Sequence, residues 1–415
     1  MRGSFTQRGG SRRGASNAPS CTALPRVGSE QRPGACGAAV QQLQEHALTL
    51  PRAGEPCGRA ASLIAHAGPP GSTAVQSDLL DFICAGPLLD ACGLAPDAVA
   101  ADFAAWERLG RRMAQQLGFD HDGMDDTQRL RVYHYYLPVY FWVDAQMRQH
   151  KQRHAGAGSA PPLVLGISAP QGCGKSTLVE QLEQLFSWLG VRAASVSIDD
   201  FYLTRADQAA LAAAEPGNRL LQLRGNAGSH DLGLGERTLG ALRGLTAAGR
   251  TAAVPRYDKS AFGGLGDRAD EATWPVVEGP LDVVLFEGWM LGFAPVPPAA
   301  AAAVEPALTK VNDALAAYKE AWDSAVDSWL VIRIGDPQWV FGWRLQAEQR
   351  MRAAGKAGMS DEQIADFVSR YIPAYQAYLP ALYARGPTTA AAGRTLTIEV
   401  DAARAPVADQ PAPVL

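Results

Sequence analysis

The feature that most constrains the fold is a glycine-rich segment between an apolar run and an amphipathic one. Residues 163–165 are apolar, and they precede residues 166–177, which read GISAPQGCGKST. After this segment, apolar residues recur at helical spacing as far as Gly190, a residue type that often ends helices. A strand, a glycine-rich turn and a helix in this order predict a loop that binds phosphate groups.

This loop carries the residue types that binding of a nucleoside triphosphate requires. Gly172 and Gly174 let the backbone curl so that successive N–H groups point at one anion. We expect Lys175 to reach the β- and γ-phosphates and the Ser176 hydroxyl to ligate Mg²⁺. The usual pattern has glycine where this chain has Ala169, and alanine is small enough for the turn to form. The loop residues expected to bind ATP are Gly172, Cys173, Gly174, Lys175, Ser176 and Thr177.

Composition excludes several other classes of protein. The chain has 415 residues, of which 47% are hydrophobic, so it can bury a sizeable core. A net charge of -4 without a dense basic patch argues against a nucleic-acid partner, and no apolar run reaches the roughly 18 residues of a membrane span. None of the six cysteines forms a Cys-x-x-Cys pair, so we expect neither disulfides nor a zinc site. Cys173 is interpreted as a small filler of the loop, with a redox role as the alternative.

The chain divides into three predicted regions. Residues 1–75 form a leader whose first 29 residues contain five arginines but no Asp or Glu, which is typical of a transit peptide; a disordered tail is the alternative. Residues 76–150 carry apolar and aromatic residues at helical spacing and predict a helical region that packs on the core. Residues 161–405 are predicted to form the nucleotide-binding core.

Acidic residues follow two of the predicted core strands. Asp199 and Asp200 follow the β-branched run at 194–198, and Glu287 follows the apolar run at 281–286. The carboxyl ends of parallel strands face the ligand crevice in open α/β sheets. One aspartate can therefore accept the proton of an attacking hydroxyl, and Glu287 would lie near Mg²⁺, through water. Capping or solvation is the alternative for the aspartate pair.

A third group of candidates would bind the acceptor. The polar, glycine-broken segment 222–231 ends in His230 and Asp231, and Asp231 could instead, or in addition, cap the following helix. Cations at several positions could clamp a small anion, because an arginine can hold a carboxylate through two hydrogen bonds. The acceptor-side candidates are Arg224, His230, Asp231, Arg256, Tyr257 and Arg268.

A later helix carries candidates for a lid. Asp336 and Pro337 predict its start, and Arg344 and Arg350 lie along it, before the glycine- and alanine-rich segment 353–358. Arginines beside a flexible segment suit a lid that closes over phosphates. A solvated basic face is the alternative.

Several segments, in the same order, resemble the plant-type D-glycerate 3-kinases. The segments that carry the resemblance are 197–204, 224–232, 254–260, 266–270, 285–293, 343–348, 358–371 and 374–380. The resemblance runs from about residue 77 to 400. It implies an α/β fold, with a P-loop kinase-like parallel sheet flanked by helices and an N-terminal helical extension.

The resemblance also implies an activity. ATP, with Mg²⁺, would phosphorylate the 3-hydroxyl of D-glycerate in the chloroplast stroma, as part of photorespiration and after removal of the transit peptide. The wider group includes phosphoribulokinase, uridine kinase and pantothenate kinase, and it implies Asp199 as the base with Asp200 in support. Lys175 and Glu287 complete the expected catalytic set, and we expect a monomer. The alternatives are a kinase for another small hydroxyl acceptor, such as a nucleoside or sugar phosphate, and a nucleotide-dependent regulatory protein.

Overall fold

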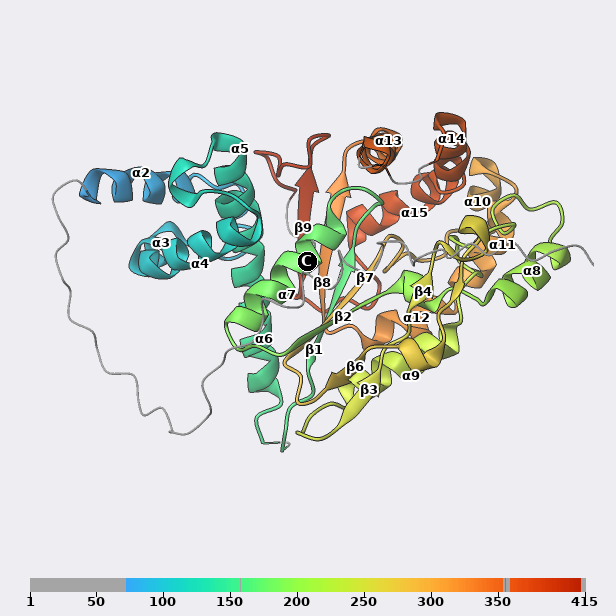
Figure 1. Ribbon diagram of the computed structural model, residues 1–415, viewed down its shortest axis with the longest axis horizontal. Helices are drawn as coiled ribbons and strands as arrows, with labels where there is room; N and C mark the ends of the chain where they lie inside the picture. Colours follow the sequence, from blue (N-terminus) through green and yellow to red (C-terminus); the bar gives the residue numbers. More distant parts are fainter. Residues whose placement is uncertain (1–71, 157, 354, 356–358, 412–415) are drawn as a thin grey trace, which may run out of the picture. The chain divides into compact units, whose positions relative to one another are not determined.

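A parallel sheet with helices around it forms the centre of the protein (Figure 1). The computed structural model describes residues 72–411 except 157, 354 and 356–358, so the predicted leader lies outside the described residues apart from its last four, which belong to a helix. The strand order is β2-β7-β1-β8-β9, and every neighbouring pair is parallel. The strands are β1 (Leu163–Ser168), β2 (Ala193–Ser197), β7 (Val283–Gly288), β8 (Ser328–Ile334) and β9 (Thr395–Val400). The predicted fold class is confirmed.

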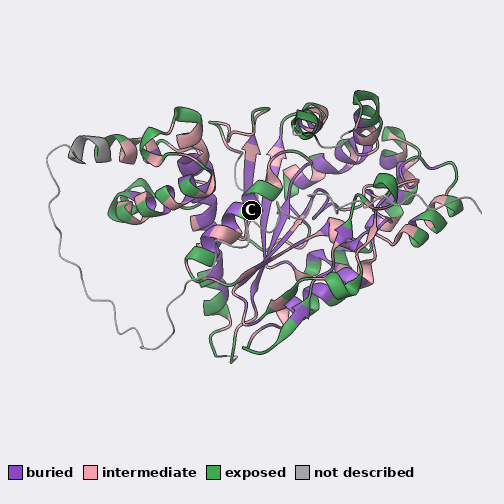
Figure 2. Ribbon diagram, in the orientation of Figure 1, coloured by how far each residue is buried: buried purple, intermediate pink, exposed green. Residues whose placement is uncertain are grey.

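Burial explains why these strands read as continuous apolar runs. Every residue of β1 is buried, and so is nearly all of β8, because helices cover the sheet (Figure 2). In the register of the sheet, Ser168 pairs with Gly288 and Ser197 with Glu287. The carboxyl ends of β1, β2 and β7 therefore meet at one edge, which brings together the segments that follow them.

Nine described helices belong to the part of the chain that builds and surrounds the sheet. They are α7 (Lys175–Trp188), α8 (Arg205–Ala214), α9 (Leu232–Arg243), α10 (Pro298–Val304), α11 (Leu308–Leu315), α12 (Tyr318–Ala321), α13 (Trp339–Ala353), α14 (Asp361–Ser369) and α15 (Ile372–Arg385). Two short antiparallel hairpins are added, β3 (Thr251–Ala253) with β6 (Val276–Glu278) and β4 (Tyr257–Asp258) with β5 (Asp267–Arg268). Both pairs of strands lie outside the parallel sheet. Short 3₁₀ turns are η1 (His121–Gly123), η3 (Ile198–Phe201), η4 (Ala261–Gly264), η5 (Glu271–Thr273) and η6 (Asp323–Ala325).

The N-terminal part of the described chain is helical and shares its core with the sheet. Its elements are α2 (Ser72–Cys84), α3 (Pro96–Ala101), α4 (Phe103–Gln116), α5 (Asp126–Arg129), the π-helix η2 (Leu130–Tyr136) and α6 (Leu137–Arg153). Helix α4 packs on α7, and α6 packs on β1. The Ser328 hydroxyl donates a hydrogen bond to Gln146 over 3.0 Å, and Trp106 and Met113 are buried in the same apolar core as the strands. Among the described residues, no helix is both long and apolar enough to cross a membrane.

Candidate active site

The predicted phosphate loop connects β1 directly to α7. Gly172 and Gly174 have φ angles of 82° and 99°, in the left-handed region that favours glycine. Ala169 does not share this conformation, and its N–H donates to the carbonyl of Gly288 over 3.1 Å, so the alanine fits without strain. Ser176 and Thr177 are exposed in the first turn of α7, where N–H groups have no helical partner.

Residues far along the chain brace the back of this loop. A Cβ atom on Gly172 would lie 2.8 Å from the Cβ atom of Trp343, so only glycine fits there. Arg404 donates from Nε to the carbonyl oxygen of Gly172 over 2.6 Å, and its guanidinium lies 5.1 Å from the centre of the Trp343 ring. The Tyr375 hydroxyl accepts the N–H of Gln171 over 3.1 Å. The loop is therefore held in one conformation by α13, α15 and the segment after β9.

The thiol of Cys173 points into the protein. Its side chain is completely buried, and burial raises its pKa to about 11. A buried, protonated thiol is a poor nucleophile. These observations favour the interpretation of Cys173 as a filler of the loop.

Lys175 and Glu287 form an ion pair at the open edge of the sheet. Each side chain is 13% exposed. Glu287 and Ser176 also line a cleft of about 240 Å³, and Asp200 and Arg256 line the same cleft. The carboxyl ends of the strands therefore place Lys175, which can bind phosphate groups, beside the side-chain oxygen atoms of Ser176 and Glu287.

This oxygen set fits Mg²⁺ bound together with a nucleotide. Among the described residues, no group of three or more His, Cys, Asp or Glu side chains is placed to hold a metal ion. Mg²⁺ usually keeps several waters and takes only one or two carboxylates, with phosphate oxygens as further ligands. Ser176 and Glu287 would supply such a partial set.

The two neighbouring aspartates have different surroundings. Asp200 accepts the N–H of Ser197 over 3.3 Å, which closes a capping box on η3, and it also accepts a hydrogen bond from Arg256 over 3.3 Å. Asp199 instead accepts a hydrogen bond from Nζ of Lys259 over 2.5 Å. Asp200 therefore stabilises the turn η3, whereas Asp199 contacts Lys259.

Electrostatics separate the two aspartates further. Burial is the largest influence on both and raises the pKa of Asp200, although Arg256 opposes it. At Asp199 the raising effect of burial is outweighed by the charges of Lys259 and Lys175, so its pKa lies below the usual value. Asp199 is therefore ionised at neutral pH.

Each of the three arginines predicted to bind the acceptor donates hydrogen bonds to other residues of the protein. Arg224 donates to the carbonyls of Gly264 over 3.0 Å and of Leu265. Arg256 donates to Asp200, as described. Arg268 donates to the carbonyl of Tyr202 over 3.2 Å and to Asp231 over 3.0 Å.

His230, Asp231 and Tyr257 lie close to this group. His230 stacks on Tyr202 with 4.6 Å between ring centres, and its Nδ1 lies 2.8 Å from the Tyr318 hydroxyl. Burial lowers the pKa of His230 to about 3, so the ring is neutral. Asp231 accepts the N–H of Leu234 over 2.9 Å and caps α9. The Tyr257 hydroxyl is buried without a hydrogen-bond partner among the described residues, and burial raises its pKa.

The predicted lid arginines lie on α13. Arg344 pairs with Glu348, which is 1% exposed and also accepts the N–H of Met359 over 2.9 Å. Arg350 is exposed on the same helix, and the described contacts give it no hydrogen-bond partner. Part of the connection between α13 and α14, residues 354 and 356–358, is outside the described residues.

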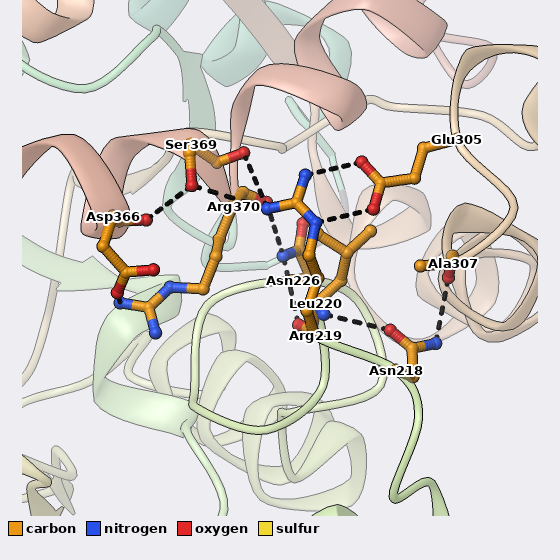
Figure 3. A network of polar contacts seen from close by, with 9 residues as sticks. All are labelled: Asn218, Arg219, Leu220, Asn226, Glu305, Ala307, Asp366, Ser369 and Arg370. Atoms are coloured by element: carbon orange, nitrogen blue, oxygen red, sulfur yellow. Dashed lines mark hydrogen bonds and ion pairs between the residues drawn. The ribbon is translucent and has the colours of Figure 1, made fainter.

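A polar network joins the acceptor-side loop to the end of α14 and to the connection between α10 and α11 (Figure 3). Asn226 donates to the carbonyls of Leu220 over 3.2 Å and of Arg370 over 3.0 Å. Arg219 donates to both carboxylate oxygens of Glu305, over 2.7 and 2.6 Å. The segment that carries Arg224 is therefore fixed to two distant parts of the chain.

Sequence reasoning missed three residues of this site. Lys259 was not among the predicted site residues, and its partner Asp199 lies 60 positions away. Trp343 and Arg404 contact Gly172, and Arg404 is 232 positions from it. For Lys259, its proximity to the predicted acceptor-side cations was a usable signal. Nothing in the sequence around Arg404 indicates its contact.

The parallel sheet, the phosphate loop and the lysine at its end define the class of protein, a P-loop nucleotide-binding protein. Comparisons with known proteins identify the family. The chain is 51% identical over 331 residues to "D-glycerate 3-kinase, chloroplastic" of Arabidopsis thaliana, a match that covers 80% of this chain and 73% of that protein. The chain therefore belongs to the D-glycerate 3-kinase family.

Two further comparisons agree with this assignment. The solved structure of D-glycerate 3-kinase from Cryptococcus neoformans has a TM-score of 0.61 and 36% identity, and the match covers 66% of this chain and 97% of that chain. "Uncharacterized kinase mug58" of Schizosaccharomyces pombe is 38% identical over 231 residues, which are 53% of this chain and 82% of that protein. No protein-family model matches the chain.

Proposed function

We propose that the chain transfers the γ-phosphoryl group of ATP to the 3-hydroxyl of D-glycerate. The observation that carries the proposal is Asp199, an ionised carboxylate at the end of β2 and within the influence of Lys175. A protein that only bound or slowly hydrolysed the nucleotide would need no carboxylate prepared for an alcohol. The name of the Arabidopsis relative supports D-glycerate as the acceptor.

The proposed reaction is an in-line displacement. The 3-hydroxyl oxygen attacks the γ-phosphorus, its proton passes to Asp199, and the bond from phosphorus to the bridging oxygen of ADP breaks. Lys175 and the N–H groups of the phosphate loop hold the β- and γ-phosphates. Asp200 supports the reaction indirectly, because it caps the turn that positions Asp199.

The remaining residues neutralise charge. Ser176 and Glu287 would hold Mg²⁺, which when bound neutralises charge on the phosphate oxygens. Arg344 and Arg350 would contribute from α13 when the lid closes, which requires Arg344 to exchange its pairing with Glu348 for phosphate.

The decisive experiment incubates the full chain with ATP, MgCl₂ and D-glycerate and identifies the product by mass spectrometry and NMR. We expect 3-phosphoglycerate, formed at a rate that depends on D-glycerate. A panel of nucleosides and sugar phosphates tests the other acceptors in parallel. Faster turnover with one of these, or phosphorylation at the 2-hydroxyl, would overturn the proposed substrate or site of transfer. ATP binding without acceptor-dependent turnover would indicate a regulatory protein.

We further propose that the protein acts as a monomer in the chloroplast stroma, as part of photorespiration, after removal of its leader. The Arabidopsis relative is described as chloroplastic, which supports this location. Import of the full chain into isolated chloroplasts, with shortening of the imported product, tests the location. Light scattering of the imported form tests the monomer, and a dimer mass would contradict it.

A further inference from the structure

The loop between β4 and β5 brings a lysine to the base. This loop runs from Lys259 to Gly266, and its conformation depends on glycine: a Cβ atom on Gly266 would lie 2.5 Å from the Tyr257 ring. At its start, Nζ of Lys259 lies 2.5 Å from Asp199. The lysine side chain is 58% exposed, so it can move between partners, whereas Asp199 is only 27% exposed.

Arg224 fixes the position of this loop. Its guanidinium donates to three backbone carbonyls of the loop, those of Lys259 over 3.4 Å, of Gly264 over 3.0 Å and of Leu265. The guanidinium also lies 5.4 Å from the centre of the Tyr257 ring. Three of the five N–H donors of Arg224 are bound to these carbonyls, which leaves fewer donors for an additional carboxylate.

The other two candidate arginines are also committed. Arg256 pairs with Asp200 in the cleft that Ser176 lines, and Arg268 pairs with Asp231 at the start of α9. Lys259 is in direct contact with Asp199, and its side chain is 58% exposed, compared with 42% for Arg256 and 18% for Arg268.

We propose that Lys259 is a catalytic residue that binds the carboxylate of the acceptor, and that Arg224 is its positioning residue. The inference rests on the proposed function, because it assigns the carboxylate-binding group of the same site. Only one carbon separates the carboxylate carbon of glycerate from the carbon that bears the 3-hydroxyl. One ammonium beside Asp199 can therefore contact the carboxylate while the hydroxyl faces the base.

This arrangement also selects for a charged acceptor. Lys259 transfers no proton in this proposal; its ammonium exchanges Asp199 for the carboxylate of the substrate. The exchange removes the strongest attraction that holds Asp199 in its ionised form, which makes Asp199 a better proton acceptor. A neutral alcohol cannot draw the ammonium away, so the base would stay paired.

The test removes the ammonium group of Lys259 and compares the kinetic constants for D-glycerate with those for ATP. Lys259→Met should raise the KM for D-glycerate or lower kcat/KM by about 10- to 150-fold, the range expected for one lost charge-assisted hydrogen bond, while the KM for ATP changes less than about twofold. Lys259→Arg should recover most of this loss. Inhibition by D-lactate, which has the carboxylate but no 3-hydroxyl, should weaken in Lys259→Met by a similar factor.

The chain offers a closely matched control in Lys151→Met. Lys151 pairs with Asp282 over 2.6 Å, and the exposed fractions of that pair, 58% and 27%, equal those of Lys259 and Asp199. This variant should keep the wild-type KM values, and melting temperatures of both variants report on folding. If Lys259→Met does not fold, Lys259→Gln replaces it.

Three results would overturn the inference. They are unchanged D-glycerate kinetics in Lys259→Met, an equal loss for ATP and D-glycerate, and unchanged inhibition by D-lactate. Failure of the proposed function is distinguishable from these, because it is seen in the wild-type protein, which would then not phosphorylate D-glycerate.

Discussion

The nucleotide side and the acceptor side of the site are built in different ways. On the nucleotide side, the loop residues expected to bind ATP are consecutive, from the turn after β1 into the first turn of α7, and most of them would act through backbone N–H groups. On the acceptor side, Asp199 and its partner Lys259 are 60 positions apart and act through side chains. Arg224 then holds the loop of Lys259 from a third segment.

This difference indicates which substitutions should impair each half of the site. Backbone N–H groups survive most substitutions, so the nucleotide side depends mainly on one ammonium group and on the bracing of the loop. The acceptor side depends on several side chains that must each be held in place. The four predictions that follow test this difference, starting with the largest expected effect.

Removal of the ammonium on the nucleotide side should have the largest effect. Lys175→Ala should lower kcat at least about 1,000-fold, because the charge of the γ-phosphoryl group would lose its main stabilising cation. The melting temperature should also fall, because each side chain of the pair is only 13% exposed and Glu287 would lose its partner. Steady-state kinetics with ATP and D-glycerate provide the measurement. A variant with near-normal kcat would remove Lys175 from the mechanism.

On the acceptor side, substitution of Asp199 should mainly lower kcat, whereas substitution of Asp200 should mainly lower the melting temperature. Asp199→Asn should lower kcat about 100- to 10,000-fold, the range for loss of a general base. Asp200→Asn should lower kcat less and should lower the melting temperature more, because Asp200 caps η3 and pairs with Arg256. Kinetics and thermal unfolding of both variants test this. The opposite order of kcat values would make Asp200 the base.

Loss of the positioning arginine should have a smaller effect, confined to the acceptor. Arg224→Gln should raise the KM for D-glycerate about tenfold, because one amide cannot replace the hydrogen bonds that hold the loop of Lys259. The matched control is Arg333→Gln: Arg333 lies 5.4 Å from the Tyr383 ring, as Arg224 does from Tyr257, but pairs with Glu399 instead. Equal KM values for Arg224→Gln and the wild type would separate Arg224 from the acceptor.

The smallest effect concerns stability and the neutral ring of His230. Its pKa is lowered to about 3 in the folded protein, chiefly by burial, and is about 6.5 when unfolded. The unfolded chain therefore binds a proton that the folded one does not, and the free energy of unfolding falls by about 1.4 kcal/mol per pH unit as the pH decreases below 6.5. His230→Phe should lose this part of the pH dependence. Denaturant unfolding between pH 7 and pH 5 measures it, and parallel curves for the two proteins would show that folding does not lower the pKa of His230.

The fold was largely predictable because its strands are buried and its loop is local. The apolar runs at 163–165 and 281–286 and the β-branched run at 194–198 predicted β1, β7 and β2 to within two residues at five of their six ends. The pairing partner of the short strand β3 was not predictable, because three alternating residues do not distinguish the edge of a parallel sheet from a separate hairpin.

Individual residues of the site could be predicted from the sequence, but the contacts between them could not. Acids at strand ends can be located from sequence, because the topology of parallel sheets places them at one edge. What each cation contacts depends on loops of irregular conformation, so the sequence could not indicate that Arg224 binds carbonyls while Lys259 reaches Asp199. The contact between Arg404 and Gly172 depends on the position of β9 at the end of the sheet order.

That last contact sets an order of events during protein synthesis. Gly172 leaves the ribosome 232 residues before Arg404, so the phosphate loop must exist for much of translation without the brace that later fixes it. An unfinished chain would therefore lack a completed nucleotide pocket, and tight capture of ATP would begin only once the segment after β9 has been made and has docked against Trp343.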